Sequence, residues 1–153
     1  MDFLIKGLGS VFIVASTTLL GVYSSVELKN RREALSWYVG AVSEIREKVR
    51  ATSAELCKIL TGLYGSEKYF TVEAPFKVRI KKGALKERDE KIINEFFGGF
   101  GMGDTDSQIA RCDMYLALLQ KNYEEAAREF GEKSKLYKQL GFFAGLSVAV
   151  MVV

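Results

Sequence analysis

The residues best suited to chemistry lie in a glycine-rich stretch and the acidic segment after it, at positions 98–108. The glycines resemble a loop that wraps a phosphate, but the stretch lacks the lysine and the Ser/Thr of a P-loop. It also follows an apolar helical stripe, where a dinucleotide-binding fold requires a strand. We therefore interpret Gly101 and Gly103 as a sharp turn that lets two helices reverse direction.

The oxygen-bearing residues after this turn resemble part of a calcium loop. Asp104, Asp106 and Gln108 alternate as calcium ligands do, but no glycine follows at the sixth position and no glutamate at the twelfth. Helix capping explains them better, because Thr105 and Gln108 match a capping box and acids favour a helix N-terminus. We predict that Asp104, Thr105 and Gln108 cap a helix that begins here.

The inventory of reactive side chains is small. The chain has no histidine and two cysteines, Cys57 and Cys112, which excludes most zinc and triad chemistry. We expect no enzyme activity, no catalytic or metal site, no cofactor and no small-molecule substrate. In a reducing cytoplasm the two thiols are expected to be free. They are either neighbours across a helical hairpin or two unrelated small buried residues.

Two sustained heptad patterns define the elements that carry these residues. Apolar residues at 3–4 spacing predict long helices over residues 27–64 and 106–138 that pack along their length. One row on the second helix is Ile109, Leu116 and Tyr123, and the other is Cys112, Leu119 and Ala126. The first helix is expected to end at Gly62 or Gly65.

A shorter apolar stripe over residues 85–100 predicts a third helix. Residues 69–82 contain the single proline and fit either a short extended piece or a weak helical turn. The expected fold class is all-α: a long antiparallel helical hairpin plus a shorter helix, forming a small bundle.

Both ends of the chain are apolar. Residues 7–26 and 139–153 carry no formal charge, and a bilayer core requires roughly twenty apolar residues in a helix. We expect an N-terminal transmembrane helix over 1–26, a cytoplasmic helical bundle over 27–138, and a C-terminal membrane segment over 139–153. A cleaved signal peptide is the competing interpretation of the N-terminus.

Basic residues cluster beside both apolar segments. By the positive-inside rule, this flank predicts a cytoplasmic bundle, and it would favour anionic lipid headgroups. The flanking residues are Lys29, Arg31 and Arg32 on one side and Lys133, Lys135 and Lys138 on the other. The chain has 22 basic and 19 acidic residues in all, and outside these clusters they are interspersed, which is typical of a solvated surface and not of a nucleic-acid-binding one.

Small residues recur in the apolar ends. Gly141 and Gly145 have the spacing that lets helix backbones approach closely in lipid, and small residues also occur between positions 9 and 21. We predict that the two segments pack together as a membrane hairpin. A coincidence of glycines is the alternative.

The segments FGGFGMGDTDSQI (97–109) and KLYKQLGFFAGL (135–146), with STTLLG at 16–21, resemble the stage III sporulation protein AB family. The likeness is closest over residues 95–150. It implies a membrane-anchored component of the channel complex between mother cell and forespore. The family's soluble domain is similar to the helical cytoplasmic domains of type II secretion and type IV pilus platform proteins.

The resemblance also implies partners and a location. The expected partners are a mother-cell secretion-type ATPase, other stage III sporulation channel proteins and membrane lipid, and not nucleic acid. The expected location is the mother-cell membrane, that is, the outer forespore membrane, with the soluble domain in the cytoplasm. The alternative function is a membrane-tethered helical signalling adaptor that self-associates through its heptads.

Overall fold

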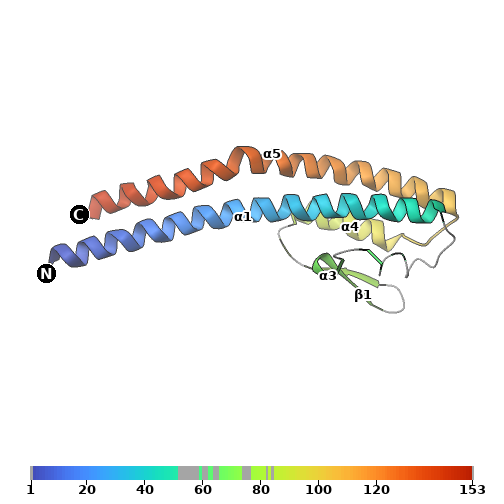
Figure 1. Ribbon diagram of the computed structural model, residues 1–153, viewed down its shortest axis with the longest axis horizontal. Helices are drawn as coiled ribbons and strands as arrows, with labels where there is room; N and C mark the ends of the chain where they lie inside the picture. Colours follow the sequence, from blue (N-terminus) through green and yellow to red (C-terminus); the bar gives the residue numbers. More distant parts are fainter. Residues whose placement is uncertain are drawn as a thin grey trace. The chain divides into compact units, whose positions relative to one another are not determined.

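Helices make up most of the protein in the structure, which is a computed structural model (Figure 1). It describes residues 2–51, 59, 62–63, 66–73, 77–81, 83 and 85–152. In chain order the elements are α1 (Asp2–Ala51), α3 (Ser66–Tyr69), β1 (Phe70–Glu73), β2 (Lys77–Ile80), α4 (Glu87–Gly98) and α5 (Thr105–Val152). The all-α class is confirmed, and the third predicted helix is α4.

The two long helices continue without a break into the apolar ends of the sequence. The described parts of the predicted segments 1–26 and 139–153, residues 2–26 and 139–152, fall within α1 and α5, respectively. Among the described residues, no helix combines the length and the apolar character needed to cross a membrane. Of the two predicted ends of the first helix, Gly62 lies in a turn and Gly65 is outside the described residues.

The chain forms two compact units, and α1 and α5 contribute to both. The first unit consists of residues 1–30 and 127–153, and the second consists of residues 31–126. The predicted bundle, 27–138, therefore extends beyond the second unit at both ends. Each unit is described separately below.

In the second unit, the segments of α1 and α5 run antiparallel. Arg46 of α1 forms an ion pair with Asp113 at 2.7 Å, and Arg31 lies 3.7 Å from Glu125. The partners follow the reverse order along α5, as an antiparallel pair requires. The Nε–H of Arg46 makes no hydrogen bond, so its contact with Asp113 is ionic only.

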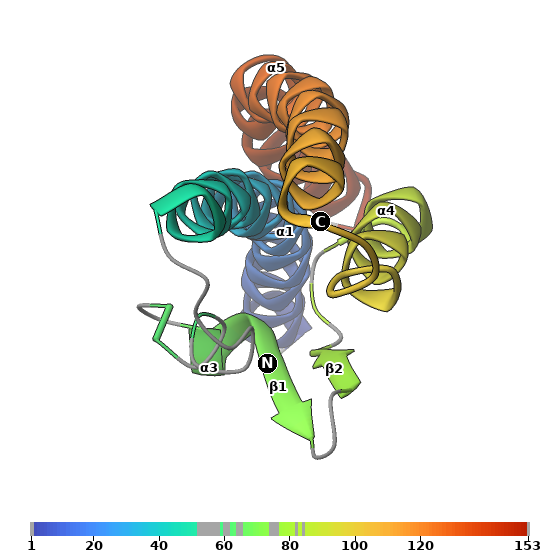
Figure 2. The ribbon, with the colours of Figure 1, turned by 90° about the vertical axis from the view of Figure 1, so that its right-hand side faces the viewer.

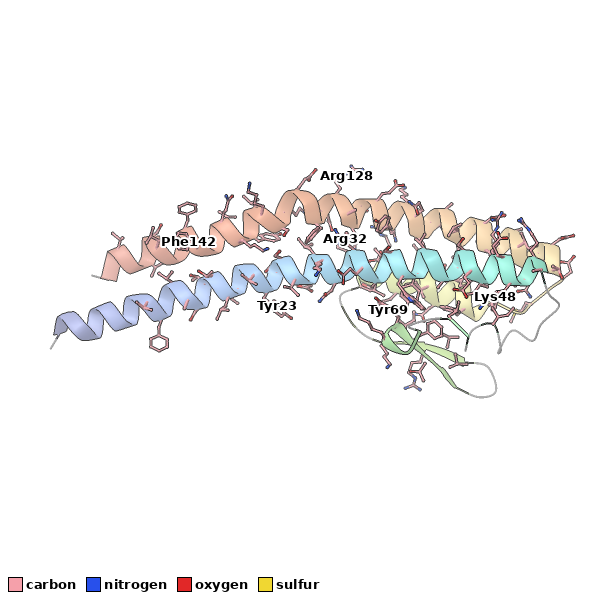
Figure 3. All side chains as sticks on the ribbon, in the orientation of Figure 1. Tyr23, Arg32, Lys48, Tyr69, Arg128 and Phe142 are labelled. Atoms are coloured by element: carbon pink, nitrogen blue, oxygen red, sulfur yellow. The ribbon has the colours of Figure 1, made fainter. Side chains whose placement is uncertain are left out.

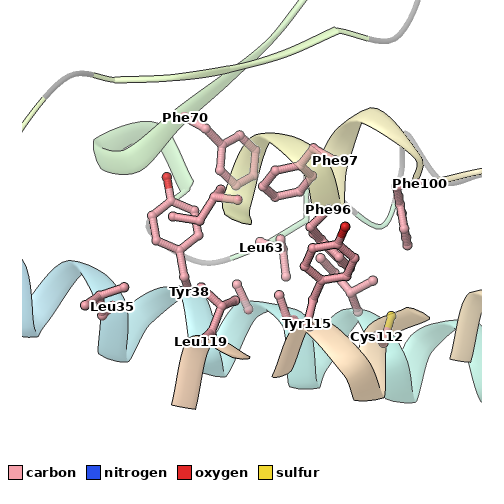
Figure 4. Packing of buried hydrophobic residues seen from close by; sticks show 14 of the residues in the cluster. Leu35, Tyr38, Leu63, Phe70, Phe96, Phe97, Phe100, Cys112, Tyr115 and Leu119 are labelled. Atoms are coloured by element: carbon pink, nitrogen blue, oxygen red, sulfur yellow. The ribbon is translucent and has the colours of Figure 1, made fainter. Parts of the chain in front are cut away.

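The core of the second unit lies where α4 and the β-strands meet the long helices (Figure 4). The apolar stripe of α4 is buried there, and the ring of Phe96 contacts Phe97, Phe100 and Tyr115 at centroid distances of 5.1–5.6 Å. Aromatic pairs at these distances add to the stabilisation by burial. The predicted third helix therefore completes the core.

The buried face of α5 differs from the predicted seam. The row Cys112, Leu119 and Ala126 is buried as predicted, whereas the row Ile109, Leu116 and Tyr123 is only half-buried. The fully buried second row is instead Gln108, Tyr115 and Asn122. The reason is α4, because Tyr115 packs on Phe96 and Asn122 bonds Asp89. The buried face of α5 therefore packs against both α1 and α4. Within the described residues, the two long helices do not form a two-helix coiled coil.

The strands β1 (Phe70–Glu73) and β2 (Lys77–Ile80) pair with each other, which selects the extended interpretation of this segment (Figure 2). The strands are antiparallel, with Phe70 opposite Ile80 and Val72 opposite Val78. These alternate apolar residues share one face, and they contribute to the core or pack against it. The amide of Lys81 extends the ladder by donating to the carbonyl of Tyr69 at 2.9 Å.

Candidate functional site

The outer surface of the first unit is apolar. Large apolar side chains project from both of its helices, with exposures from 39% at Val22 to 73% at Val150 (Figure 3). On α1 they are Val11, Phe12, Leu19, Leu20, Val22, Tyr23 and Val26, and on α5 Leu136, Leu140, Phe142, Phe143, Leu146, Val148 and Val150. So many exposed large apolar side chains on one unit are typical of a surface that contacts a protein or a membrane.

The inner surface of the same unit is lined by small residues. A methyl group on Gly141 would lie 2.6 Å from the carbonyl oxygen of Thr17, and one on Gly145 would lie 2.8 Å from the Cα of Val14. Gly21 likewise leaves no room for a side chain beside the backbone of Tyr137. Backbones approach this closely only where side chains are absent. Gly141 and Gly145 therefore face α1 at the positions anticipated for close packing.

A hydroxyl pair lies at the same helix interface. The Oγ atoms of Ser25 and Ser134 are 2.6 Å apart, and both side chains are buried. Each hydroxyl satisfies the other, so neither leaves a buried polar group without a partner. The first unit thus has glycine and serine inside and large apolar residues outside, the reverse of the usual water-soluble pattern.

The basic residues that flank the apolar segments divide into two groups. Five are exposed or half-buried: Lys29, Arg32, Lys133, Lys135 and Lys138. Arg31 is 2% exposed and pairs with Asp89, so its expected role as a cation beside lipid headgroups is wrong. It lies on the face of α1 that packs inside the second unit.

Arg31 belongs to a buried polar cluster that joins α1, α4 and α5 in the second unit. The Nε–H of Arg31 donates to Asp89 Oδ2 at 2.8 Å, and Asn122 donates to Oδ1 at 2.9 Å. Asp89 also accepts from the backbone N–H of Lys86 at 3.1 Å, at the start of α4. A carboxylate has four lone-pair positions that can accept from donors such as these. The burial of the charged Asp89 side chain is therefore tolerable. The cluster fixes α4 against α1 and α5.

Sequence reasoning missed this cluster, although a signal was present. Arg31 interrupts the heptads of α1, Asp89 precedes Ile93 on the apolar stripe of α4, and Asn122 lies between two buried positions of α5. Polar residues at three core positions, two of them of opposite charge, indicate a mutual contact.

Glu125 lies at the exposed rim of the cluster. It accepts a hydrogen bond from Arg88 at 2.6 Å, and Arg31 and Lys86 lie 3.7 and 3.8 Å away. The hydrogen bond from Arg88 and the nearby cations lower the pKa of this carboxyl. The rim is solvated, so its ion pairs contribute little to stability.

The glycine turn between α4 and α5 is present as predicted, and of the three predicted capping residues Asp104 caps the helix. Gly101 and Gly103 have φ angles of 92° and 94°, which favour glycine. The capping residue is Asp104, whose carboxylate accepts from the backbone N–H of Ser107 at 3.1 Å. Hydrogen bonding from the Ser107 side chain, and then from this N–H, lowers the pKa of the carboxyl. Thr105 is the first residue of α5 and not its cap.

Gln108 also has a role other than the predicted one. Its side-chain oxygen accepts from the backbone N–H of Gly101 at 3.2 Å, which ties the turn to the first helical turn. The capping box is therefore replaced by a cap at Asp104 and a separate bond that closes the loop. Sequence spacing alone does not distinguish these arrangements, because both satisfy free N–H groups.

Cys112 is buried in the core. Burial raises the pKa of its thiol to about 11, so the thiol stays protonated at neutral pH. Cys57 is outside the described residues, so the proximity of the two thiols stays a prediction. Within the described residues, His, Cys, Asp and Glu side chains form no cluster suited to a metal ion.

These features define an all-α protein whose distinctive surfaces serve helix packing and contact with other molecules. A family model described as stage III sporulation protein AB matches residues 71–153, more than half of the chain. The chain belongs to this family and is therefore a sporulation-related protein. No curated protein and no solved structure matches it.

Proposed function

We propose that the protein is a non-enzymatic, membrane-anchored platform of the channel complex between mother cell and forespore. The first unit inserts into the mother-cell membrane, and the second unit lies in the cytoplasm. There the second unit couples a secretion-type ATPase to the other stage III sporulation channel proteins.

The reversed polarity of the first unit carries this proposal. Water would leave residues such as Leu19, Tyr23 and Phe143 exposed at an unfavourable free energy, whereas acyl chains would cover them. Glycines and a paired hydroxyl group at the interface are typical of helices that associate in lipid.

The charged residues next to this surface support the orientation. Lys133, Lys135 and Lys138 lie close together in the sequence of α5. Lys133 and Lys135 are the sequence neighbours of Ser134, which forms the hydroxyl pair at the helix interface. Cytoplasmic flanks of membrane segments are enriched in lysine and arginine. This enrichment favours a second unit on the cytoplasmic side, where an ATPase is accessible.

The signalling-adaptor alternative has less support. It requires heptad positions that are free to pair with another copy. Leu35, Ile45 and Leu119 are instead 0–1% exposed within one chain. The platform role does not require these heptad positions to be free, so it is compatible with the packed bundle.

Lipid contact can be tested by fluorescence. The full-length Trp37→Phe/Phe143→Trp variant is reconstituted in vesicles whose lipids carry brominated acyl chains. We expect strong quenching, because bromine quenches tryptophan only at close range. The matched control is Trp37→Phe/Leu118→Trp, which places the tryptophan on the exposed face of the second unit. Equal, weak quenching of both variants would refute membrane insertion.

The platform role requires a separate experiment. The protein is isolated from sporulating cells in mild detergent, and its partners are identified by mass spectrometry. We expect the secretion-type ATPase and neighbouring channel proteins. Their absence, under conditions that retain other membrane complexes, would contradict the coupling role even if the lipid test succeeds.

A further inference from the structure

A small groove lies on the second unit, on the side of α1 formed by residues 37–44. Trp37, Gly40, Ala41 and Glu44 recur at helical spacing along it, and Leu63 forms the opposite wall. Its volume is about 250 Å³. Cofactor and drug pockets occupy roughly 300–1,000 Å³, so this groove has the size for one side chain of a partner.

The floor of the groove is open because of a glycine. A methyl group on Gly40 would meet no atom within 4 Å, so the helix surface there is accessible to an incoming group. An aliphatic chain laid over Gly40 and Ala41 would contact Leu63 on one side. The floor therefore suits the stem of a long side chain.

One end of the groove is a fixed aromatic wall. The ring of Trp37 stacks on Tyr69 with centroids 4.6 Å apart, and its neighbours Tyr38 and Phe70 lie at 5.1 and 5.7 Å. These contacts hold the indole in one orientation before any ligand arrives. A preformed wall reduces the entropy lost on binding.

The other end carries a carboxylate. Among the described residues that line the groove, Glu44 alone is charged. Its Oε1 lies 2.7 Å from Lys48, one helical turn away, and both side chains are exposed. An exposed pair of this kind is weak, so a better-matched cation would displace Lys48.

We propose that this groove binds an arginine side chain presented by a protein partner. The aliphatic stem lies over Gly40 and Ala41, and the guanidinium forms a paired hydrogen bond with Glu44. The guanidinium is preferred over an ammonium because its planar fork matches a carboxylate, with two parallel hydrogen bonds that an ammonium cannot make. The inference goes beyond the proposed platform role and does not depend on membrane insertion.

The single tryptophan of the chain provides the readout. Full-length protein in detergent micelles is titrated with N-acetyl-arginine amide, and Trp37 fluorescence is followed at constant ionic strength. We expect a saturable change with a Kd on the order of 1 mM, as for a fragment of this size. N-acetyl-citrulline amide, which is neutral and similar in shape, should give no saturable change.

Two variants locate the site. Gly40→Leu fills the floor and should abolish the response, whereas Glu44→Gln should weaken binding at least about fivefold. Glu47→Gln is the matched control, because Glu47 is exposed on the same helix and does not line the groove. If Gly40→Leu fails to fold, Glu44→Gln still tests the site, because its exposed side chain has no part in the core.

Three results would overturn the proposal. They are no saturable response to the arginine probe, an equal response to citrulline, or unchanged affinity in Glu44→Gln. An equal affinity for N-acetyl-lysine amide would overturn the assignment to arginine, because the site would then recognise positive charge alone.

Discussion

Among individual side chains, Asp89 connects α1, α4 and α5 in the second unit. Replacing it with alanine removes the acceptor of Arg31 and Asn122 and deprives the buried guanidinium of its shortest ion pair. We expect Asp89→Ala to lower the free energy of unfolding by about 3–5 kcal/mol. Chemical denaturation in detergent, followed by circular dichroism, measures this change.

Glu125→Gln is the control for that substitution, because it removes a carboxylate from the solvated rim of the same cluster. The expected loss is at most about 1 kcal/mol. Similar effects of the two substitutions would mean that the buried ion pair does not hold α4 in position.

Cys112 should make stability depend on pH in the alkaline range. The folded protein raises the pKa of its thiol from an ordinary value near 9 to about 11. The stabilising contribution is therefore complete below about pH 9 and disappears as the pH rises through about 11. The parent should lose more stability than Cys112→Ala between about pH 8.5 and 11 in denaturant titrations. Parallel losses would indicate that the thiol is not buried in solution.

At the level of whole elements, the start of α5 depends on Asp104. Asp104→Ala removes the acceptor for the Ser107 N–H and should lower Tm by about 2–4 °C. Asp104→Asn, which retains a capping oxygen, should stay close to the parent. Thr105→Ala should also have little effect, and a larger loss there would restore Thr105 as the capping residue.

The packing of the two helices in the first unit depends on Gly145. A leucine there would collide with the backbone at Val14 and push the helices apart. Ser25→Cys/Ser134→Cys, in a chain with both native cysteines replaced, should form a disulfide readily, because the two hydroxyls are 2.6 Å apart. Adding Gly145→Leu should slow this crosslink.

Ala144→Leu is the matched control for Gly145→Leu, because Ala144 is exposed on the adjacent position. Its crosslinking rate should equal that of the parent. Equal rates in all three proteins would show that the glycine contact does not hold the helices together.

The starts of α4 and α5 could be predicted because their signals are local. Apolar spacing and polar residues at the N-terminus give the expected starts at about 85 and 106, close to Glu87 and Thr105 in the structure. The choice of capping residue could not be predicted, because Asp104 and Thr105 are adjacent and both are good caps. The β-hairpin was not predicted uniquely, because a short alternation such as Phe76, Val78 and Ile80 fits both an extended piece and a weak helical turn.

The pairing of elements was harder to predict than their lengths. Gln108, Tyr115 and Asn122 are buried because α4 lies beside α5, and no spacing within α5 reports a third neighbour. Arg31 illustrates the same limit, because its partner is 58 positions away. Contacts between segments that are far apart in the sequence can be identified only from the three-dimensional fold.

For the molecule as a whole, the proposed topology predicts which part a protease reaches. In protoplasts of bacteria that express the protein, residues 31–126 should resist protease added from outside and be digested after lysis. Immunoblotting with antibodies against the second unit reports both outcomes. Digestion in intact protoplasts would invert the orientation, and a cytoplasmic ATPase could then not reach the second unit.

The hydrogen bonds from Arg31 and Asn122 to Asp89 restrict how this protein can change over evolution. An arginine at position 31 without an acid at 89 would lose its buried counter-charge, and the buried acid without its donors would also be unfavourable. Mutational drift at one position is therefore tolerated only with compensation at the others. Related chains should keep the three residues as a set or replace them together with apolar ones.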